Sequence, residues 1–280
     1  MAVYASGRAR TPLVDVTEAM GGRMRVLAKV EGTPDGGSIK DRTVEYMVRR
    51  AMKEHEGISA VIEASSGNTA VSLASAAGKL GLEALLFVPG GSGIKAERAR
   101  ELGAAVVETP AGEGTAGAQL RAEEAALSMS GSLYLRQHSN RANPMAHLRS
   151  TGPEILHEAG PPDLLVAGIG TGGTLAGLSG FFRGHGTLSV GVCPETGTEI
   201  PGLRRLDPEG VPIHRGLSLL PVLEVDPDRA EWWRRRVRRL TGIDAGPSSG
   251  AAAAAASELV LGCSSGIAVV VFPDHGRNYR

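Results

Sequence analysis

Short apolar runs alternate with longer segments of helical periodicity along almost the whole chain. Runs rich in valine, leucine and isoleucine predict buried strands, whereas apolar residues three and four apart predict helices. The expected strands are 24–32, 59–64, 83–89, 104–110, 163–170, 188–195 and 267–273. The expected helices are 41–56, 68–81, 94–103, 116–130, 174–183 and 228–242, followed by an alanine-rich helix from Gly250. Strands joined by helices of this length predict an α/β fold with parallel sheets that are covered on both faces.

The composition is that of an ordinary globular protein and argues against several classes. The chain has 30 Lys+Arg and 30 Asp+Glu, and its net charge of +0 argues against binding to nucleic acid or an acidic membrane. No apolar run approaches the roughly 20 residues of a membrane span, and MAVYASGRARTP lacks the apolar core of a secretory signal. Only Cys193 and Cys263 are present, so we expect two small buried thiols, no metal site and a cytoplasmic protein.

The segment GGSIKDR (36–42) places Lys40 in the first turn of a predicted helix. The positive end of the helix dipole lowers the pKa of a lysine there, which favours a nucleophile or a Schiff base. The alternative is a surface lysine beside Asp41 and Arg42.

Two further turns join a predicted strand to a helix. In the segment EASSGNT (63–69), hydroxyls and helix N–H groups converge, as in an anion site, although an ordinary helix cap explains one hydroxyl by itself. The segment GIGTGGT (168–174) presents bare backbone at a helix start, which suits a phosphate. Gly168, Gly170 and Gly173 also fit the dinucleotide pattern, with Glu195 following the next strand. The segment lies past the midpoint of the chain and contains two threonines, and both features favour a site for a single phosphate over a dinucleotide site.

A fourth segment, GPSSG (246–250), precedes a run of alanines, and taken alone it is a capped helix start. Together the four segments supply a lysine for an imine, a phosphate cradle, a carboxylate site and a spare hydroxyl, which are the parts that hold pyridoxal phosphate (PLP) and an amino acid. The chain resembles the fold-type II PLP enzymes, and within them the cysteine synthase (O-acetylserine sulfhydrylase) family of the B type. The resemblance rests on TPLV, GGSIKDR, SSGNT, QHSNRANP, TGPEI, GTGGT, ETGTEIPGLRR, GPSSGAA and PDHGRNY.

That resemblance implies a tryptophan synthase β-like fold of two parallel or mostly parallel sheets flanked by helices, with the active site between two domains. Residues 36–141 would form a smaller, mobile α/β domain that carries the loop for the substrate carboxylate. Residues 1–35 and 142–280 would form a larger α/β domain that carries the loop for the PLP phosphate. The domain boundary is expected in the Gly/Pro/Asn-containing stretch 140–153.

The resemblance also implies a role for each candidate residue. Lys40 is the catalytic residue, which forms the Schiff base with PLP and moves the α-proton. Asn68 bonds the ring oxygen of PLP and Ser248 faces its pyridine nitrogen. The PLP phosphate is held by Gly170, Thr171, Gly172, Gly173 and Thr174. The substrate carboxylate is bound by Ser65, Ser66, Thr69 and Gln137.

A neutral hydroxyl at the ring nitrogen does not keep that nitrogen protonated, so Ser248 favours loss of a β-leaving group over transamination. The expected reaction is β-replacement on O-acetylserine or O-phosphoserine through aminoacrylate, in which a sulfur donor yields L-cysteine or S-sulfocysteine. The alternatives are a paralogue that uses another nucleophile to make a non-protein amino acid, an NAD-dependent oxidoreductase, and a non-catalytic scaffold. The resemblance implies a homodimer and leaves room for a sulfur-carrier protein.

The sequence does not decide the roles of two groups of side chains, the arginines 204 and 205 and the histidines. Arg204 and Arg205 are either solvated, or paired with Asp207 and Glu209, or one of them binds an anionic substrate through its planar fork. The scattered histidines have no ligand spacing, and we expect them to be surface or hydrogen-bonded residues: His55, His147, His157, His185 and His214.

Overall fold

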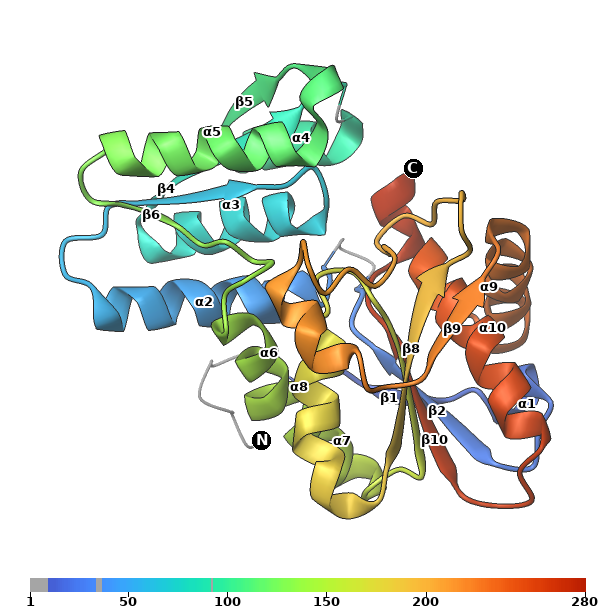
Figure 1. The fold of residues 1–280 in the computed structure, drawn as a ribbon. Coiled ribbons are helices and arrows are strands. Elements are labelled where there is room, and N and C mark those ends of the chain that lie inside the picture. The colour runs from blue at the N-terminus through green and yellow to red at the C-terminus, as the bar shows by residue number, and fades with distance from the viewer. Residues whose placement is uncertain (1–9, 34–36, 92) are drawn as a thin grey trace. The chain divides into compact units, whose positions relative to one another are not determined.

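The computed structural model describes residues 10–33, 37–91 and 93–280 (Figure 1). The chain divides into two compact units: unit 1 contains the residues up to Ile39 and Asn143–Tyr279, and unit 2 contains Lys40–Ala142 and Arg280. Each unit holds one sheet flanked by helices, so the predicted α/β class with two mostly parallel sheets is confirmed. Gly36 of the GGSIKDR segment lies outside the described residues.

Unit 1 is built on a six-stranded sheet in the order β1-β2-β10-β7-β8-β9, parallel except for β1, which pairs antiparallel with β2. Its strands are β1 Leu13–Asp15, β2 Arg25–Val30, β7 Leu164–Gly168, β8 Leu188–Pro194, β9 Val222–Val225 and β10 Ile267–Phe272. Its α-helices are α1 Thr17–Met20, α6 Ala142–Ala146 (whose first residue belongs to unit 2), α7 Gly152–Ala159, α8 Gly173–Phe182, α9 Pro227–Thr241 and α10 Pro247–Leu261. Short π or 3-10 turns are η2 His147–Thr151, η3 Arg183–His185, η4 Pro212–Leu217 and η5 Gly276–Tyr279.

Alternation along the strands of unit 1 divides its core into two layers. Ala268, Val270 and Phe272 of β10 belong to a cluster that also contains residues of α1, α9 and α10. Val269 and Val271 belong to a second cluster with residues of α7, α8 and η4. Because successive strand side chains point to opposite faces, the sheet is buried on both sides. Its strands therefore appear in the sequence as continuous apolar runs.

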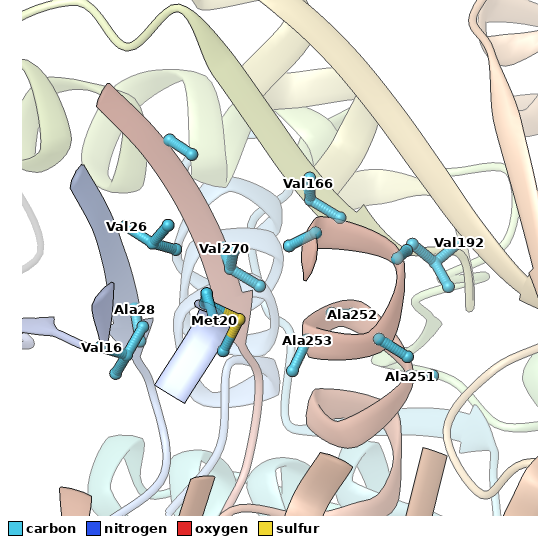
Figure 2. Close-up of a cluster of buried hydrophobic side chains, with 14 of the residues drawn as sticks. Val16, Met20, Val26, Ala28, Val166, Val192, Ala251, Ala252, Ala253 and Val270 are labelled. Carbon is cyan, nitrogen blue, oxygen red and sulfur yellow. The ribbon is translucent and has the colours of Figure 1, made fainter. Parts of the chain in front are cut away.

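The alanine-rich helix α10 lies against the sheet of unit 1. All six residues of the run Ala251–Ala256 are fully buried. Figure 2 shows Ala251, Ala252 and Ala253 beside the sheet residues Val166 and Val192. On the side toward α9, a Cβ atom added at Gly250 would lie 2.1 Å from the carbonyl oxygen of Ala230. Small side chains thus let α10 approach both the sheet and α9 closely.

Unit 2 contains a four-stranded parallel sheet in the order β5-β4-β3-β6. Its strands are β3 Ala60–Ala64, β4 Glu83–Pro89, β5 Ala105–Thr109 and β6 Ser132–Tyr134. Its helices are α2 Lys40–Glu54, α3 Asn68–Leu80, α4 Gly93–Glu101, the 3-10 turn η1 Ala111–Glu113 and α5 Gly114–Ser128. One core cluster contains residues of α2, α3 and α4, and another contains residues of α5.

The structure adds elements that the sequence pattern did not predict and corrects two predictions. The short strands β1, β6 and β9 and the helical segment 142–159 are new. The alanine-rich helix begins at Pro247 rather than at Gly250, because Pro247 occupies its first turn. Cys193 is buried as expected, whereas Cys263 is exposed in the turn after α10. Within the described residues, no helix is both long and apolar enough to cross a membrane.

Candidate functional site

The glycine-rich turn of unit 1 connects the buried strand β7 to helix α8. Gly172, the residue that caps α8, has a φ of 82° and no side chain with which to cap the helix. The first N–H groups of a helix have no partner within the helix, and the helix dipole favours negative charge there. A Cβ atom would lie 2.8 Å from the Gly202 oxygen at Gly170, and 1.8 Å from the Asn143 Oδ1 at Gly173. The turn is therefore close-packed bare backbone at a helix N-terminus.

Two buried side chains on the segment before α7 support this turn. The amide Nδ2 of Asn143 donates to Thr171 Oγ1 over 3.0 Å. Nε2 of His147 lies 3.3 Å from Thr174 Oγ1, while its Nδ1 lies 3.0 Å from Thr151 Oγ1. His147 is fully buried and hydrogen-bonded. The histidines were expected to be either surface residues or hydrogen-bonded residues, and His147 is of the second kind.

A third buried side chain contacts the turn from η4. The backbone N–H of Asp207 donates to Nδ1 of His214 over 3.0 Å, and Nε2 of His214 lies 3.0 Å from the carbonyl oxygen of Gly170. Since Nδ1 accepts a hydrogen bond, the proton of the neutral ring is on Nε2, which donates to Gly170. Burial lowers the pKa of His214 below its usual value, which is consistent with a neutral ring.

The N-terminus of α10 brings hydroxyl groups to the same part of unit 1. Ser248 and Ser249 are buried, and Ser249 Oγ makes no hydrogen bond with any described residue. A Cβ atom on Gly202, whose φ is 89°, would lie 3.5 Å from Ser248 Oγ. Because Gly202 also contacts Gly170, it lies between the glycine-rich turn and Ser248. No carboxylate occupies the first turn of α10.

In unit 2, the N-termini of α2 and α3 lie side by side. Lys40 is the first residue of α2, is partly buried, and follows Ile39 directly in the chain. Its neighbour Asp41 accepts a hydrogen bond of 2.6 Å from Ser72, which lies one turn after Asn68 at the start of α3. Lys40 and Asn68 are thus at the leading ends of two adjacent helices.

The turn 65–69 of unit 2 leads from β3 into α3. Gly67 caps α3 without a side chain, and its own N–H donates to Ser65 Oγ over 3.2 Å. Ser66 is exposed, whereas Thr69 is buried and its hydroxyl donates to Gln137 Oε1 over 2.7 Å. Four of the residues predicted to bind the substrate carboxylate are therefore brought together in one unit.

Beneath this turn lies a fully buried carboxylate that the sequence interpretation did not assign. Glu63, in β3, accepts hydrogen bonds from the backbone N–H groups of Ala64 (2.9 Å) and Gln137 (3.0 Å). Burial raises the pKa of Glu63 to about 7. The two hydrogen bonds from backbone N–H groups act in the opposite direction and lower the pKa, but burial has the larger effect. The Glu63 carboxyl in turn contributes to raising the pKa of Tyr134, for which burial is the larger cause.

The two neighbouring arginines of unit 1 have different surroundings. Arg205 is exposed and pairs with Glu224 over 2.7 Å, so its partner is not Asp207 or Glu209. Arg204 is partly buried, and burial lowers the pKa of its guanidinium. The backbone N–H of Arg204 donates to the carbonyl oxygen of Ile169 over 2.8 Å, which holds this segment against the turn 170–174.

The chemistry of these groups matches the result of a comparison with protein families. The family model described as pyridoxal-phosphate dependent enzyme matches residues 4–274. The chain belongs to this family. This PLP-dependent enzyme is of the β-replacing type.

Individual relatives of this PLP-dependent enzyme cover nearly its whole length. Cysteine synthase B of Pseudomonas aeruginosa is 35% identical over 279 residues, which include 96% of this chain and 92% of that protein. The solved O-acetylserine dependent cystathionine beta-synthase of Helicobacter pylori superposes with a TM-score of 0.85 at 30% identity, covering 97% of this chain and 94% of that one. An O-ureido-L-serine synthase superposes with a TM-score of 0.87 at 28% identity, covering 96% and 90%.

The residues present fit PLP on structural grounds. A phosphate needs backbone N–H donors that side chains of the same turn do not cover, and the glycines at the start of α8 provide them. The buried Ser249 Oγ has no hydrogen-bond partner among the described residues, so the start of α10 has room for a further polar group. The pyridine nitrogen of PLP is such a group, and we expect the neighbouring hydroxyl of Ser248 to face it.

Sequence reasoning missed the residues that support the turns. Asn143 and His147 belong to the stretch QHSNRANP and its continuation, where a polar pair before a helix is a weak signal. Glu63 was quoted within EASSGNT, and a single acidic residue inside an apolar strand was the signal that could have identified it. His214 has no motif around it, and only the three-dimensional structure identifies its contact with Gly170.

Proposed function

We propose that this enzyme replaces the β-substituent of an O-activated L-serine, O-acetylserine or O-phosphoserine, with a sulfur nucleophile to give L-cysteine or S-sulfocysteine. The observation that carries the proposal is the first turn of α10, which presents the hydroxyl groups of Ser248 and Ser249 and contains no acidic residue. The buried carboxylate of Asp274, which lies beside Gly246, already accepts a hydrogen bond from the Tyr279 hydroxyl. The names of relatives support the substrate class, since one is a cysteine synthase and another depends on O-acetylserine.

PLP, when bound, supplies an electron sink that weakens the bonds to the α-carbon of an attached amino acid. The helix N-terminus of α8, with Gly170, Thr171, Gly172, Gly173 and Thr174, binds the phosphate. Ser248 hydrogen-bonds the ring nitrogen without protonating it, and Asn68 bonds the ring oxygen. Lys40 holds the cofactor and, once released, takes the α-proton on Nζ.

The leading end of α3 orients the substrate. Ser65 and Ser66 donate their hydroxyl hydrogens to the carboxylate, and Thr69 donates its backbone N–H. The Thr69 hydroxyl donates to Gln137 and holds that side chain for the same task. Loss of acetate or phosphate from the β-carbon would be followed by addition of the sulfur nucleophile to that carbon and by return of the proton from Lys40 Nζ to the α-carbon. We further propose that residues 36–141 act as the mobile domain, and that the enzyme is a cytoplasmic homodimer that can accept sulfur from a carrier protein.

A second nucleophile class is favoured by one comparison. Because one close structural neighbour is an O-ureido-L-serine synthase, an N-hydroxyurea oxygen is a chemically reasonable acceptor for the same β-carbon. This acceptor would make a non-protein amino acid. We place it second because cysteine synthase B of Pseudomonas aeruginosa is 35% identical to this chain, whereas the O-ureido-L-serine synthase is 28% identical.

The test is a matrix of donors and acceptors with product identification by mass spectrometry. The donors are O-acetyl-L-serine and O-phospho-L-serine, and the acceptors are sulfide, thiosulfate and hydroxyurea. We expect product with sulfide or thiosulfate, and loss of both the visible absorbance and turnover in Lys40→Ala. Normal turnover in that variant would show that another lysine acts. The absence of product from every pair would reject the proposed reaction.

A further inference from the structure

His214 is a buried histidine that joins two segments of unit 1. It lies in η4, is fully buried, and contacts the turn 170–174 on one side and the segment 204–211 on the other. Its Nδ1 accepts from the N–H of Asp207, and its Nε2 donates to the carbonyl oxygen of Gly170, each over 3.0 Å. Both ring nitrogens are thus used within the protein.

The bond to Gly170 determines the direction of a peptide group in the turn. In a planar trans peptide, the carbonyl of one residue and the N–H of the next point in opposite directions. His214 holds the carbonyl of Gly170, so the N–H of Thr171 points away from the imidazole. A ring that fixes one carbonyl therefore aims one donor of the anion-binding turn.

Packing makes the same contact rigid. A Cβ atom on Gly172 would lie 2.7 Å from Cδ2 of His214 and 3.0 Å from Cδ1 of Leu217. The imidazole thus lies directly against the backbone of the turn, where any side chain at position 172 would displace it. Glycine at position 172 therefore permits both the left-handed backbone conformation and the close approach of the imidazole.

The second segment is also held in place. Asp207 accepts from the N–H groups of Gly210 (Oδ1, 2.8 Å) and Val211 (backbone oxygen, 3.0 Å). The segment 204–211 is therefore a structured loop whose N–H at Asp207 is presented to His214. The charges that face the ring are Arg204, which disfavours the imidazolium, and Asp207, which favours it, and burial outweighs both.

We propose that His214 is a positioning residue for the cofactor phosphate: its neutral ring fixes the Gly170 carbonyl and locks the segment 204–211 to the turn 170–174. This inference rests on the proposed role of that turn. It predicts that His214 affects the binding of a ligand with a phosphate and has little effect on the same ligand without one.

The test compares PLP with pyridoxal, which lacks the phosphate, by equilibrium dialysis against the full-length apoprotein. His214→Asn keeps an acceptor near Nδ1 but loses the donor to Gly170, whereas His214→Gln places an N–H near Nε2. We expect His214→Asn to reduce the preference for PLP over pyridoxal by roughly tenfold or more, since a buried carbonyl loses its donor. His214→Gln is expected to restore most of the preference, and His55→Asn is the exposed control.

The outcomes separate this inference from the proposed function. If the wild-type protein binds pyridoxal as tightly as PLP, the assignment of the turn to the phosphate is wrong, and the inference falls with it. If the wild type prefers PLP and His214→Asn keeps that preference, only the inference is overturned. If the variants fail to fold, the ¹⁵N chemical shifts of the His214 ring in the wild-type protein test the inference instead. A charged ring or an Nδ1–H tautomer at neutral pH overturns the inference.

Discussion

Two turns of this enzyme follow a parallel strand and begin a helix, yet their surroundings differ. The turn 170–174 of unit 1 is in contact with three buried side chains, and Cβ atoms at three of its glycines would meet neighbours within 2.8 Å. In the turn 65–69 of unit 2, a Cβ atom on Gly67 would have, among the described residues, only Ser65 Oγ within 4 Å, at 3.9 Å. One turn is enclosed by the protein, and the other is open.

This contrast fits the two ligands that we propose. A cofactor stays bound through many turnovers, so a pre-formed, rigid turn lowers the cost of ordering it. A substrate must enter and leave, so its turn needs open backbone and a few anchoring side chains. The supporting groups also respond to pH in opposite ways: burial disfavours the charged form of both, so it lowers the pKa of His214 and raises that of Glu63.

Glu63 provides the largest predicted effect. Its pKa is raised from 4.5 to about 7 in the folded enzyme, so the folded state binds more protons between these values, and stability falls as pH rises through them. Relative to Glu63→Gln, the wild type is expected to lose about 3 kcal/mol of unfolding free energy from pH 4.5 to pH 8. Urea unfolding of both proteins across this range measures it. Parallel curves would mean that the pKa of Glu63 is the same in the folded and the unfolded enzyme.

The enclosed turn can be tested by adding one methyl group. At Gly173, an added Cβ must displace the Asn143 side chain. Overpacking of this kind costs about 1–3 kcal/mol, so Gly173→Ala is expected to weaken PLP binding roughly tenfold to a hundredfold. In Gly67→Ala the methyl meets open space, and PLP affinity is expected to stay within about twofold. Equal losses in both variants, measured by PLP titration, would remove the contrast between the turns.

The hydroxyl at the start of α10 is the next site to alter. Ser248→Asp is expected to retain PLP but to slow β-replacement about tenfold or more, because a carboxylate keeps the ring nitrogen protonated and over-stabilises the carbanion. Ser248→Ala, which removes the hydroxyl without adding charge, is the control. PLP absorbance and the rate of O-acetylserine consumption are the measurements. Unchanged kinetics in the aspartate variant would refute the role given to Ser248.

The smallest predicted effect extends the comparison to helices. Gly78 of α3 is exposed, and no atom of the described residues lies within 4 Å of an added Cβ. Gly78→Ala should therefore stabilise the enzyme by about 0.5–1 kcal/mol through helix propensity. At Gly250 of α10 the same change should destabilise it, since the Cβ would lie 2.1 Å from the Ala230 oxygen. Chemical denaturation measures the change in unfolding free energy for each variant. A stabilising effect of Gly250→Ala would show that α9 and α10 can separate.

The sequence predicted the parts of the molecule that repeat a pattern. The apolar run 267–273 predicted a strand buried on both faces, and β10 is that strand. The segment GIGTGGT predicted a strand-to-helix turn, which is present between β7 and α8. Short elements such as β1 and β6 escaped prediction because three residues carry too little periodicity. The roles of Lys40, Asn68 and Ser248 remain predictions.

Contacts between distant segments could not be predicted, because no local rule specifies them. Arg205 pairs with Glu224 on a neighbouring strand rather than with an acidic residue nearby in sequence. His214 reaches Gly170 only because η4 folds back over the turn. Cys263 is exposed although a lone thiol is usually buried, since it follows the end of α10 at the surface.

The buried alanines of α10 have a consequence for order as well as for packing. Alanine has no side-chain rotamers to lose, so burying the run Ala251–Ala256 costs no rotamer entropy, whereas longer side chains would each cost up to about 2 kcal/mol. The run also has no alternative rotamers through which it could repack. A helix that lies this close to its neighbours moves as a rigid body. The hydroxyl groups at its first turn are therefore held in fixed positions.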